Sequence, residues 1–129
     1  MALLPWQRAK KWHMESGSTT SFEEVLGMFM REGYVWSSPT EFVLAKQALW
    51  EDGELHVGAV SSNCWFVHLA AADGLGGNPF RRFLELAPYP LPFVAWQRHG
   101  LKRYHVYEWD KFKNKLEDKY GNKSFSTGP

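Results

Sequence analysis

The stretch of sequence that decides the fold reads Cys64-Trp-Phe-Val-His-Leu-Ala-Ala-Ala-Asp73-Gly-Leu-Gly-Gly-Asn78-Pro79. Its first part is apolar at almost every position, which is typical of a strand buried on both faces at the centre of a sheet. By strict alternation, Leu69 is expected on the face of Trp65 and Ala70 on the face of Phe66. Glycines then form a tight turn, and Asn78 before Pro79 is a typical helix start. The stretch therefore predicts a central strand, a glycine-rich turn and a helix that covers the sheet.

Upstream of the central strand, the patterns predict a helix and a hairpin. Residues 22–32 carry apolar side chains at helical spacing after a capping box that starts at Thr20 or Ser21. Residues 42–50 are compatible with a helix or a strand, but Asp52-Gly53 is a strong hairpin turn and residues 55–59 alternate after it. We therefore prefer a strand, and the two strands of this hairpin form a meander with the central strand.

Downstream, a helix over 78–87 leads to a strand over 93–97, so this strand is expected to run parallel to the central one. Residues 101–109 form its antiparallel partner after a reversal at His99-Gly100, and a basic helix follows over 111–119. We read residues 1–20 as an N-terminal arm and residues 120–129 as a polar tail. The prediction is one α/β (α+β) domain over 21–119, with a twisted, mostly antiparallel sheet of about five strands flanked by helices.

Composition limits the class of protein. The chain has 129 residues, is 44% hydrophobic and has a formal net charge of +1, so it suits one folded domain with no overall field toward nucleic acid or membrane. Its single cysteine, Cys64, excludes an internal disulfide and a multi-cysteine zinc site. No apolar run approaches the roughly 20 residues needed to cross a bilayer. We expect a soluble protein of the cytoplasm.

The glycine-rich turn is the strongest candidate for a ligand site. Backbone N–H groups at the start of a helix hold anions, and two arginines follow within one turn. The residues concerned are Gly74, Gly76, Gly77, Asn78, Arg81 and Arg82. They do not make a Walker motif, and the alternative is a tight strand-to-helix connection capped by Asn78.

At this point the order of elements resembles the core of GNAT-type acyltransferases, in which an analogous turn holds the pyrophosphate of coenzyme A. Cys64–Asp73 resembles the strand before that loop, and Gly74-Leu-Gly-Gly77 resembles the loop. The aromatic segments at 33–39, 64–69 and 91–96 are similar to those of small GNAT-like proteins carried by bacteriophages and prophages. The resemblance covers about residues 22–109 and implies acetyl-CoA as a cofactor.

Two departures separate the chain from an active enzyme of that family. Asp73 places a carboxylate where the family holds phosphates, and a negative charge opposes anion binding. The family also has a helix with a catalytic tyrosine after its next strand, whereas residues 93–109 form a hairpin here, with Tyr104 and Tyr107 as strand residues. The resemblance therefore implies the fold more than the activity.

Catalytic and metal-ligating side chains give little signal. His68 is the candidate general base, but Cys64 lies four residues away along the same strand, too far for a direct hydrogen bond. We read the pair as a structural histidine and a buried thiol. The set His56, His68, His99 and His105 has no spacing typical of a metal site, so no metal is expected.

Aromatic and basic residues suggest binding surfaces. Seven tryptophans exceed what one small core readily hides, and Trp6, Trp12, Trp36 and Trp109 lie at the margins of the expected elements. They are our candidates for an interface with a protein partner or a second copy, the alternative being that they fill the edges of the core. Basic residues near Trp6 and toward the C-terminus keep nucleic-acid binding open, although acidic residues are interspersed.

The function predicted from the sequence is a non-catalytic GNAT-like protein, encoded by a phage or prophage, that binds a protein partner and needs no cofactor. It would work in the host cytoplasm or in the virion. The first alternative is an acyl-CoA-dependent N-acyltransferase that uses acetyl-CoA, with His68 as the catalytic candidate. The second alternative is a nucleic-acid-binding module.

Overall fold

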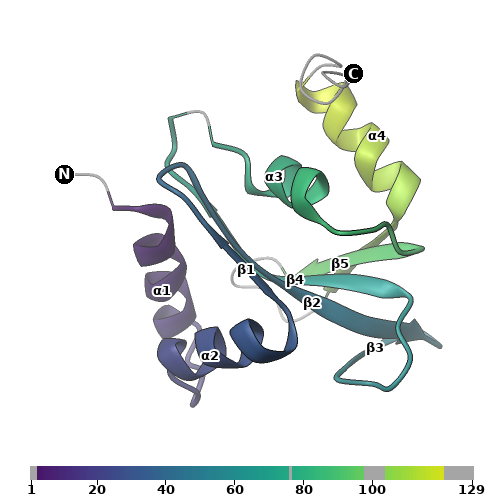
Figure 1. The fold of residues 1–129 in the computed structure, drawn as a ribbon, viewed down its shortest axis with the longest axis horizontal. Helices are drawn as coiled ribbons and strands as arrows, with labels where there is room; N and C mark the ends of the chain where they lie inside the picture. The colour runs from purple at the N-terminus through teal and green to yellow at the C-terminus, as the bar shows by residue number, and fades with distance from the viewer. Residues whose placement is uncertain (1–2, 76, 98–103, 121–129) are drawn as a thin grey trace.

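The computed structural model describes residues 3–75, 77–97 and 104–120, with the side chains described up to residue 116. Within these residues the chain forms four helices and six strands in a single α+β domain, which confirms the predicted class (Figure 1). The elements are α1 (Pro5–Glu15), α2 (Phe22–Glu32), β1 (Tyr34–Ser37), β2 (Glu41–Glu51), β3 (Glu54–Val57), β4 (Cys64–Ala72), α3 (Pro79–Leu86), β5 (Phe93–Gln97), β6 (Tyr104–Glu108) and α4 (Trp109–Tyr120). None of the described helices is long and apolar enough to cross a membrane.

The sheet runs in the order β1-β2-β4-β5-β6, so β4 is central as predicted. The pair β4 and β5 is parallel and the other pairs are antiparallel, because α3 carries the chain over the sheet between those two strands. Strand β1 is a sixth strand that the sequence did not predict. It shares one edge of β2 with β3, since β1 pairs with residues 42–45 and β3 with residues 48–51.

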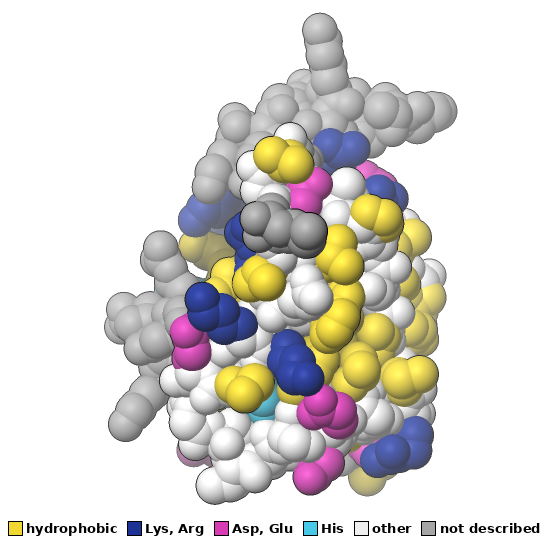
Figure 2. All heavy atoms as spheres, turned by 90° about the vertical axis from the view of Figure 1, so that its left-hand side faces the viewer, with side chains coloured by type: hydrophobic (Ala, Val, Ile, Leu, Met, Phe, Trp, Pro, Cys, Tyr) yellow, Lys and Arg dark blue, Asp and Glu magenta, His cyan; other side chains and the backbone are white. Residues whose placement is uncertain are grey.

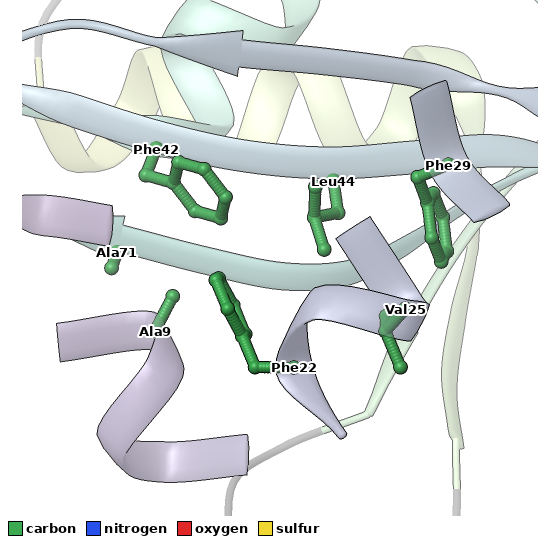
Figure 3. Packing of buried hydrophobic residues seen from close by; sticks show 7 residues of the cluster. All are labelled: Ala9, Phe22, Val25, Phe29, Phe42, Leu44 and Ala71. Atoms are coloured by element: carbon green, nitrogen blue, oxygen red, sulfur yellow. The ribbon is translucent and has the colours of Figure 1, made fainter. Parts of the chain in front are cut away.

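Two helical layers cover the two faces of the sheet (Figure 1). On one face, α1 and α2 pack on β2 and β4 through a core of Ala9, Phe22, Val25, Phe29, Phe42, Leu44 and Ala71, which Figure 3 shows. On the other face, α3 and α4 pack on the sheet. The buried residues of this second core are Val43, Ala45, Trp65, Val67, Phe83, Val94 and Phe112. The expected N-terminal arm therefore contains a helix that belongs to the core, because Pro5, Ala9 and His13 recur at helical spacing and are buried.

A β-bulge at His68 reverses which side chains of the following part of β4 face each helical layer. Leu44 of β2 pairs with Leu69 and the next residue, Ala45, pairs with Val67, so His68 is the extra residue. Leu69 therefore packs with the α1/α2 core and Ala70 with the α3/α4 core. This is opposite to the facing expected from strict alternation.

Several local expectations are confirmed. Ser21 caps α2 by accepting the N–H of Glu24, and Asn78 caps α3 by accepting the N–H of Arg81. Asp52 and Gly53 have φ angles of +54° and +75°, as a type I′ hairpin turn requires. The expected reversal at His99-Gly100 and residues 121–129 of the expected tail lie outside the described residues.

Candidate functional site

The glycine-rich turn joins the end of β4 to the start of α3, as the sequence predicted. One carboxylate oxygen of Asp73, Oδ1, accepts the backbone N–H of Leu75 at 2.9 Å and that of Gly77 at 3.0 Å. The Asp73 N–H itself donates to the carbonyl of Thr40 at 3.0 Å. Two of the backbone donors that could hold an external anion in this turn are therefore bonded to the chain's own carboxylate.

Gly77 is needed for the close approach of the turn to β2. A Cβ on Gly77 would lie 2.1 Å from the carbonyl oxygen of Thr40 and 2.9 Å from Oε2 of Glu41. No side chain fits there without moving backbone atoms. Gly74 has a φ of +80°, which glycine adopts without strain. These glycines serve the geometry of the connection, and Gly76 lies outside the described residues.

The two arginines of α3 are engaged with acidic side chains. The Arg81 Nε donates to Glu85 at 3.0 Å. The Arg82 guanidinium donates to Glu85 at 3.3 Å and to Glu41 at 3.1 Å. An incoming phosphate would have to compete with these carboxylates.

Glu41 is the buried member of this ion-pair network. Its side chain is only 8% exposed. Burial alone raises the pKa of the Glu41 carboxyl, but hydrogen bonds from Thr40 and Arg82 outweigh it and hold the pKa below its ordinary value. Glu41 therefore carries a charge at neutral pH and ties α3 to the start of β2.

Helix α1 also reaches this turn, which the sequence analysis missed. The two terminal nitrogens of Arg8 lie 3.6 and 3.8 Å from the position of a Cβ on Gly74. The Arg8 side chain therefore brings the first turn of α1 to the turn after β4. The helical spacing of Pro5, Ala9 and His13 was the available signal.

His68 and Cys64 make separate contacts on the central strand. The His68 ring stacks on Phe29 at 5.4 Å and meets the edge of His13 at 6.4 Å. Burial, together with the nearby His13, lowers the pKa of His68 to about 4. Burial raises the pKa of the Cys64 thiol to about 12, and its Sγ lies 3.5 Å from the carbonyl of Trp65. A neutral imidazole and a protonated thiol, with no hydrogen bond between them in the described contacts, suit a structural role.

Of the other histidines in the predicted set, His105 stacks on Trp96 with ring centroids 5.6 Å apart. His56 is exposed on β3, 3.7 Å from Glu54. Within the described residues no three side chains of His, Cys, Asp or Glu are close enough to hold a metal ion. His99 lies outside those residues.

The four candidate interface tryptophans occupy different environments. Trp12 packs against the α1/α2 core, and Trp36 and Trp109 pack against the α3/α4 core, each contacting Phe83 at 6.1 Å between ring centroids. These three are half-buried. Trp6 is 39% exposed, so it is the member of the set most available to a partner.

Other exposed apolar side chains lie near Trp6 in the sequence and on the neighbouring turn. Leu3 and Leu4 precede it at the start of α1, and Leu75 of the glycine-rich turn is 87% exposed. Arg8 links the two segments, as described above. We call Leu3, Leu4, Trp6 and Leu75 the apolar tip. Figure 2 views the molecule from the side of α1, where hydrophobic side chains gather among basic and acidic ones.

Basic residues on the described surface are mixed with acidic partners. Lys10 pairs with Glu23 at 3.0 Å and Lys111 with Glu108 at 2.8 Å. Lys115 donates to the hydroxyl of Tyr107 at 2.7 Å. Arg98, Lys102 and Arg103 lie outside the described residues. The described part is a face of mixed charge.

Comparison of the chain with protein-family models, with curated proteins and with solved structures gives no significant match. The resemblance to GNAT proteins therefore stays a prediction from the sequence.

Proposed function

We propose that the chain is a non-catalytic protein of the GNAT-like type that binds a protein partner through the apolar tip. The observation that carries the first half of this proposal is the position of Asp73. Its carboxylate occupies two backbone donors, the N–H groups of Leu75 and Gly77, in the turn that corresponds to the loop an acyltransferase would offer to coenzyme A. A cofactor with negative phosphates would have to displace a fixed negative charge there.

The side chains that could support transfer chemistry also favour a non-catalytic protein. The one histidine on the central strand is held neutral between aromatic rings, and the one thiol is buried and protonated. Neither has a partner that would activate it as a base or a nucleophile in the described contacts.

The apolar tip supports the second half of the proposal. Three large exposed side chains follow one another closely in the sequence where α1 begins. They are Leu3, Leu4 and Trp6. Leu75 adds a fourth on the neighbouring turn. Large apolar side chains exposed together, with Trp among them, are typical of a surface that another protein covers.

A titration with acetyl-CoA tests the first half. A ligand present at about 100 times its dissociation constant stabilises a fold by roughly 2.7 kcal/mol, which is a large shift in melting temperature. We expect no shift for the wild-type chain at millimolar acetyl-CoA, and no acyl transfer to amine substrates. A shift that disappears in Gly74→Asp would reverse the proposal in favour of the acyltransferase.

A site-specific crosslinking experiment tests the second half. A photoreactive amino acid is placed at Leu75 and, as a matched control, at the exposed Glu51 on the far hairpin. We expect one discrete adduct from Leu75, either with another protein or with a second copy of the chain. The adduct should be lost in Trp6→Ser and absent with Glu51. Equal adducts from both positions would contradict the assignment of the tip.

A further inference from the structure

The edge of the sheet has a gap of two residues at Lys46 and Gln47. Strand β1 pairs with β2 up to Ala45, and β3 pairs with β2 from Ala48 onward, so these two residues pair with neither strand on this edge. Their other edge is fully paired with β4. An open pocket of about 520 Å³ lies at the gap. It is lined by Arg31, Glu32, Gly33 and Tyr34 on the β1 side, by Gly58 and Ala59 on the β3 side, and by Lys46 and Gln47.

The pairing pattern shows which backbone groups face the gap. The Ser38 N–H donates to the carbonyl of Glu41, so the odd-numbered residues of β2 bond toward β1. The two-residue turn at Asp52-Gly53 closes on a bonded pair at Glu51, so the odd-numbered residues also bond toward β3. By this alternation the N–H of Gln47 points into the gap, whereas its C=O lies where the ladder with β3 continues to Gly58.

Lys46 supplies a positive charge at the same place. Its side chain is 6% exposed, and its Nζ lies 3.3 Å from Oε1 of Glu32 and 5.8 Å from the centre of the Phe29 ring. A buried lysine is rare unless it is paired, and Glu32 is the one hydrogen-bond partner of this ammonium in the described contacts. The Glu32 side chain is 54% exposed, so its carboxylate has one side in water. A carboxylate, that of Glu32, is thus already bound at the Nζ and is itself half in contact with solvent.

Gly33 allows the end of α2 to pack closely against β2 at the wall of the pocket. A Cβ on Gly33 would lie 2.6 Å from the carbonyl oxygen of Ala45 and 2.7 Å from Cβ of Lys46. The end of α2 therefore packs directly on the backbone beside the lysine. The position of Nζ relative to the Gln47 backbone is set by these rigid elements rather than by loops.

We propose that this gap binds a carboxylate with an adjacent amide, as in the C-terminal residue of a peptide or a free N-acyl amino acid. The carbonyl of the ligand's amide would accept the N–H of Gln47, and the carboxylate would bind Lys46 with Arg31 nearby. Strands β1 and β3 close both ends, and at about 3.3 Å per residue the gap admits one or two residues of extended chain. It therefore suits the end of a chain and excludes a strand that runs through. The site is separate from the apolar tip and does not depend on the proposed function.

The test is an NMR titration of the full chain with N-acetylglycine, with N-acetylglycine amide as the uncharged control. We expect shifts of the Gln47 and Lys46 amide signals with the acid and not with the amide. Lys46→Met should weaken binding at least tenfold, and Glu32→Gln should strengthen it several-fold, because the competing carboxylate is gone. Lys10→Met, which breaks an exposed ion pair elsewhere, should leave binding unchanged.

Two further arms make the outcome decisive. Ala59→Trp places a large side chain on the β3 side of the pocket, so it should also abolish binding in a chain whose spectrum stays folded. N-acetyl-tetraglycine binding more tightly than N-acetylglycine identifies a peptide terminus as the ligand, and equal affinity identifies the small acid. Equal binding of the acid and the amide, or binding that survives both Lys46→Met and Ala59→Trp, overturns the proposal.

Discussion

The carboxylate of Asp73 accepts the backbone N–H of Gly77 across 3.0 Å, in the same turn in which it accepts the N–H of Leu75. The turn is therefore an anion site whose anion is covalently part of the chain. The same aspartate that makes the turn unsuited to phosphates makes it a well-defined connection between β4 and α3. One residue thus bears on both the stability of the fold and the absence of cofactor binding that we propose.

Removing this carboxylate should weaken the fold and open the turn. In Asp73→Ala the N–H groups of Leu75 and Gly77 lose their acceptor, which costs about 1–3 kcal/mol of unfolding free energy. Urea unfolding measures the loss, with Glu51→Ala as a control at an exposed position. Inorganic phosphate should then stabilise Asp73→Ala more than the wild type. Equal effects of phosphate on the two chains would show that Asp73 does not occupy an anion site.

Alanine substitutions at Gly77 and Gly17 distinguish the stability cost of a close contact from that of backbone strain. In Gly77→Ala the new Cβ would meet the Thr40 carbonyl at 2.1 Å, so strand or turn must shift, and we expect a loss of about 3 kcal/mol. Gly17 has a φ of +77° and no atom within 4 Å, so Gly17→Ala meets only backbone strain of about 1 kcal/mol. Calorimetric melting of both variants gives the comparison. A milder effect of Gly77→Ala than of Gly17→Ala would mean that the turn does not pack on β2 in this way.

Local signals in the sequence predicted most elements of this fold. Ser21, Asn78 and the Asp52-Gly53 turn act through contacts within a few residues, and each is found as expected. The parallel pair β4 and β5 also followed from the sequence, because the intervening helix fixes the direction of the chain.

The features that the sequence did not reveal depend on tertiary contacts. Strand β1 has four residues and forms because β2 offers it an edge. The bulge at His68 is a mismatch between two strands, which neither strand shows alone. The position of the turn between β4 and α3 was predicted, but the bonding of its N–H groups to Asp73 depends on the orientation of that side chain, which the sequence does not show.

The tryptophans should divide into two groups by stability. Trp36 and Trp109 contact Phe83 in the core, so Trp36→Ala and Trp109→Ala should each cost about 3 kcal/mol. Trp6 is exposed, so Trp6→Ser should change the unfolding free energy by less than about 0.5 kcal/mol. Chemical unfolding of the three variants provides the measurement. A loss of stability in Trp6→Ser as large as in the other two would remove Trp6 from the apolar tip and place it in the core.

The lowered pKa of His68 leads us to expect that the free energy of unfolding falls in mild acid. Burial, with His13 nearby, lowers the pKa of His68 from 6.5 to about 4 in the folded chain. Above pH 6.5 neither the folded nor the unfolded chain protonates this ring, so its contribution to stability is complete. Between pH 6.5 and 4 the unfolded chain takes up a proton that the folded chain excludes, and stability falls by at most about 3 kcal/mol. Below pH 4 both states are protonated and this loss stops growing.

Urea unfolding at pH 7.0 and at pH 5.0 measures this effect. His68→Phe should keep the stacking on Phe29 and remove the part of the pH dependence that His68 causes, whereas the exposed His56→Gln should leave it in place. The buried Glu41 acts in a lower window, because its depressed pKa makes stability fall only as the pH drops below the ordinary carboxyl range. An unchanged difference between pH 7.0 and 5.0 in His68→Phe would assign the acid sensitivity to another group and show that the His68 imidazole reaches solvent.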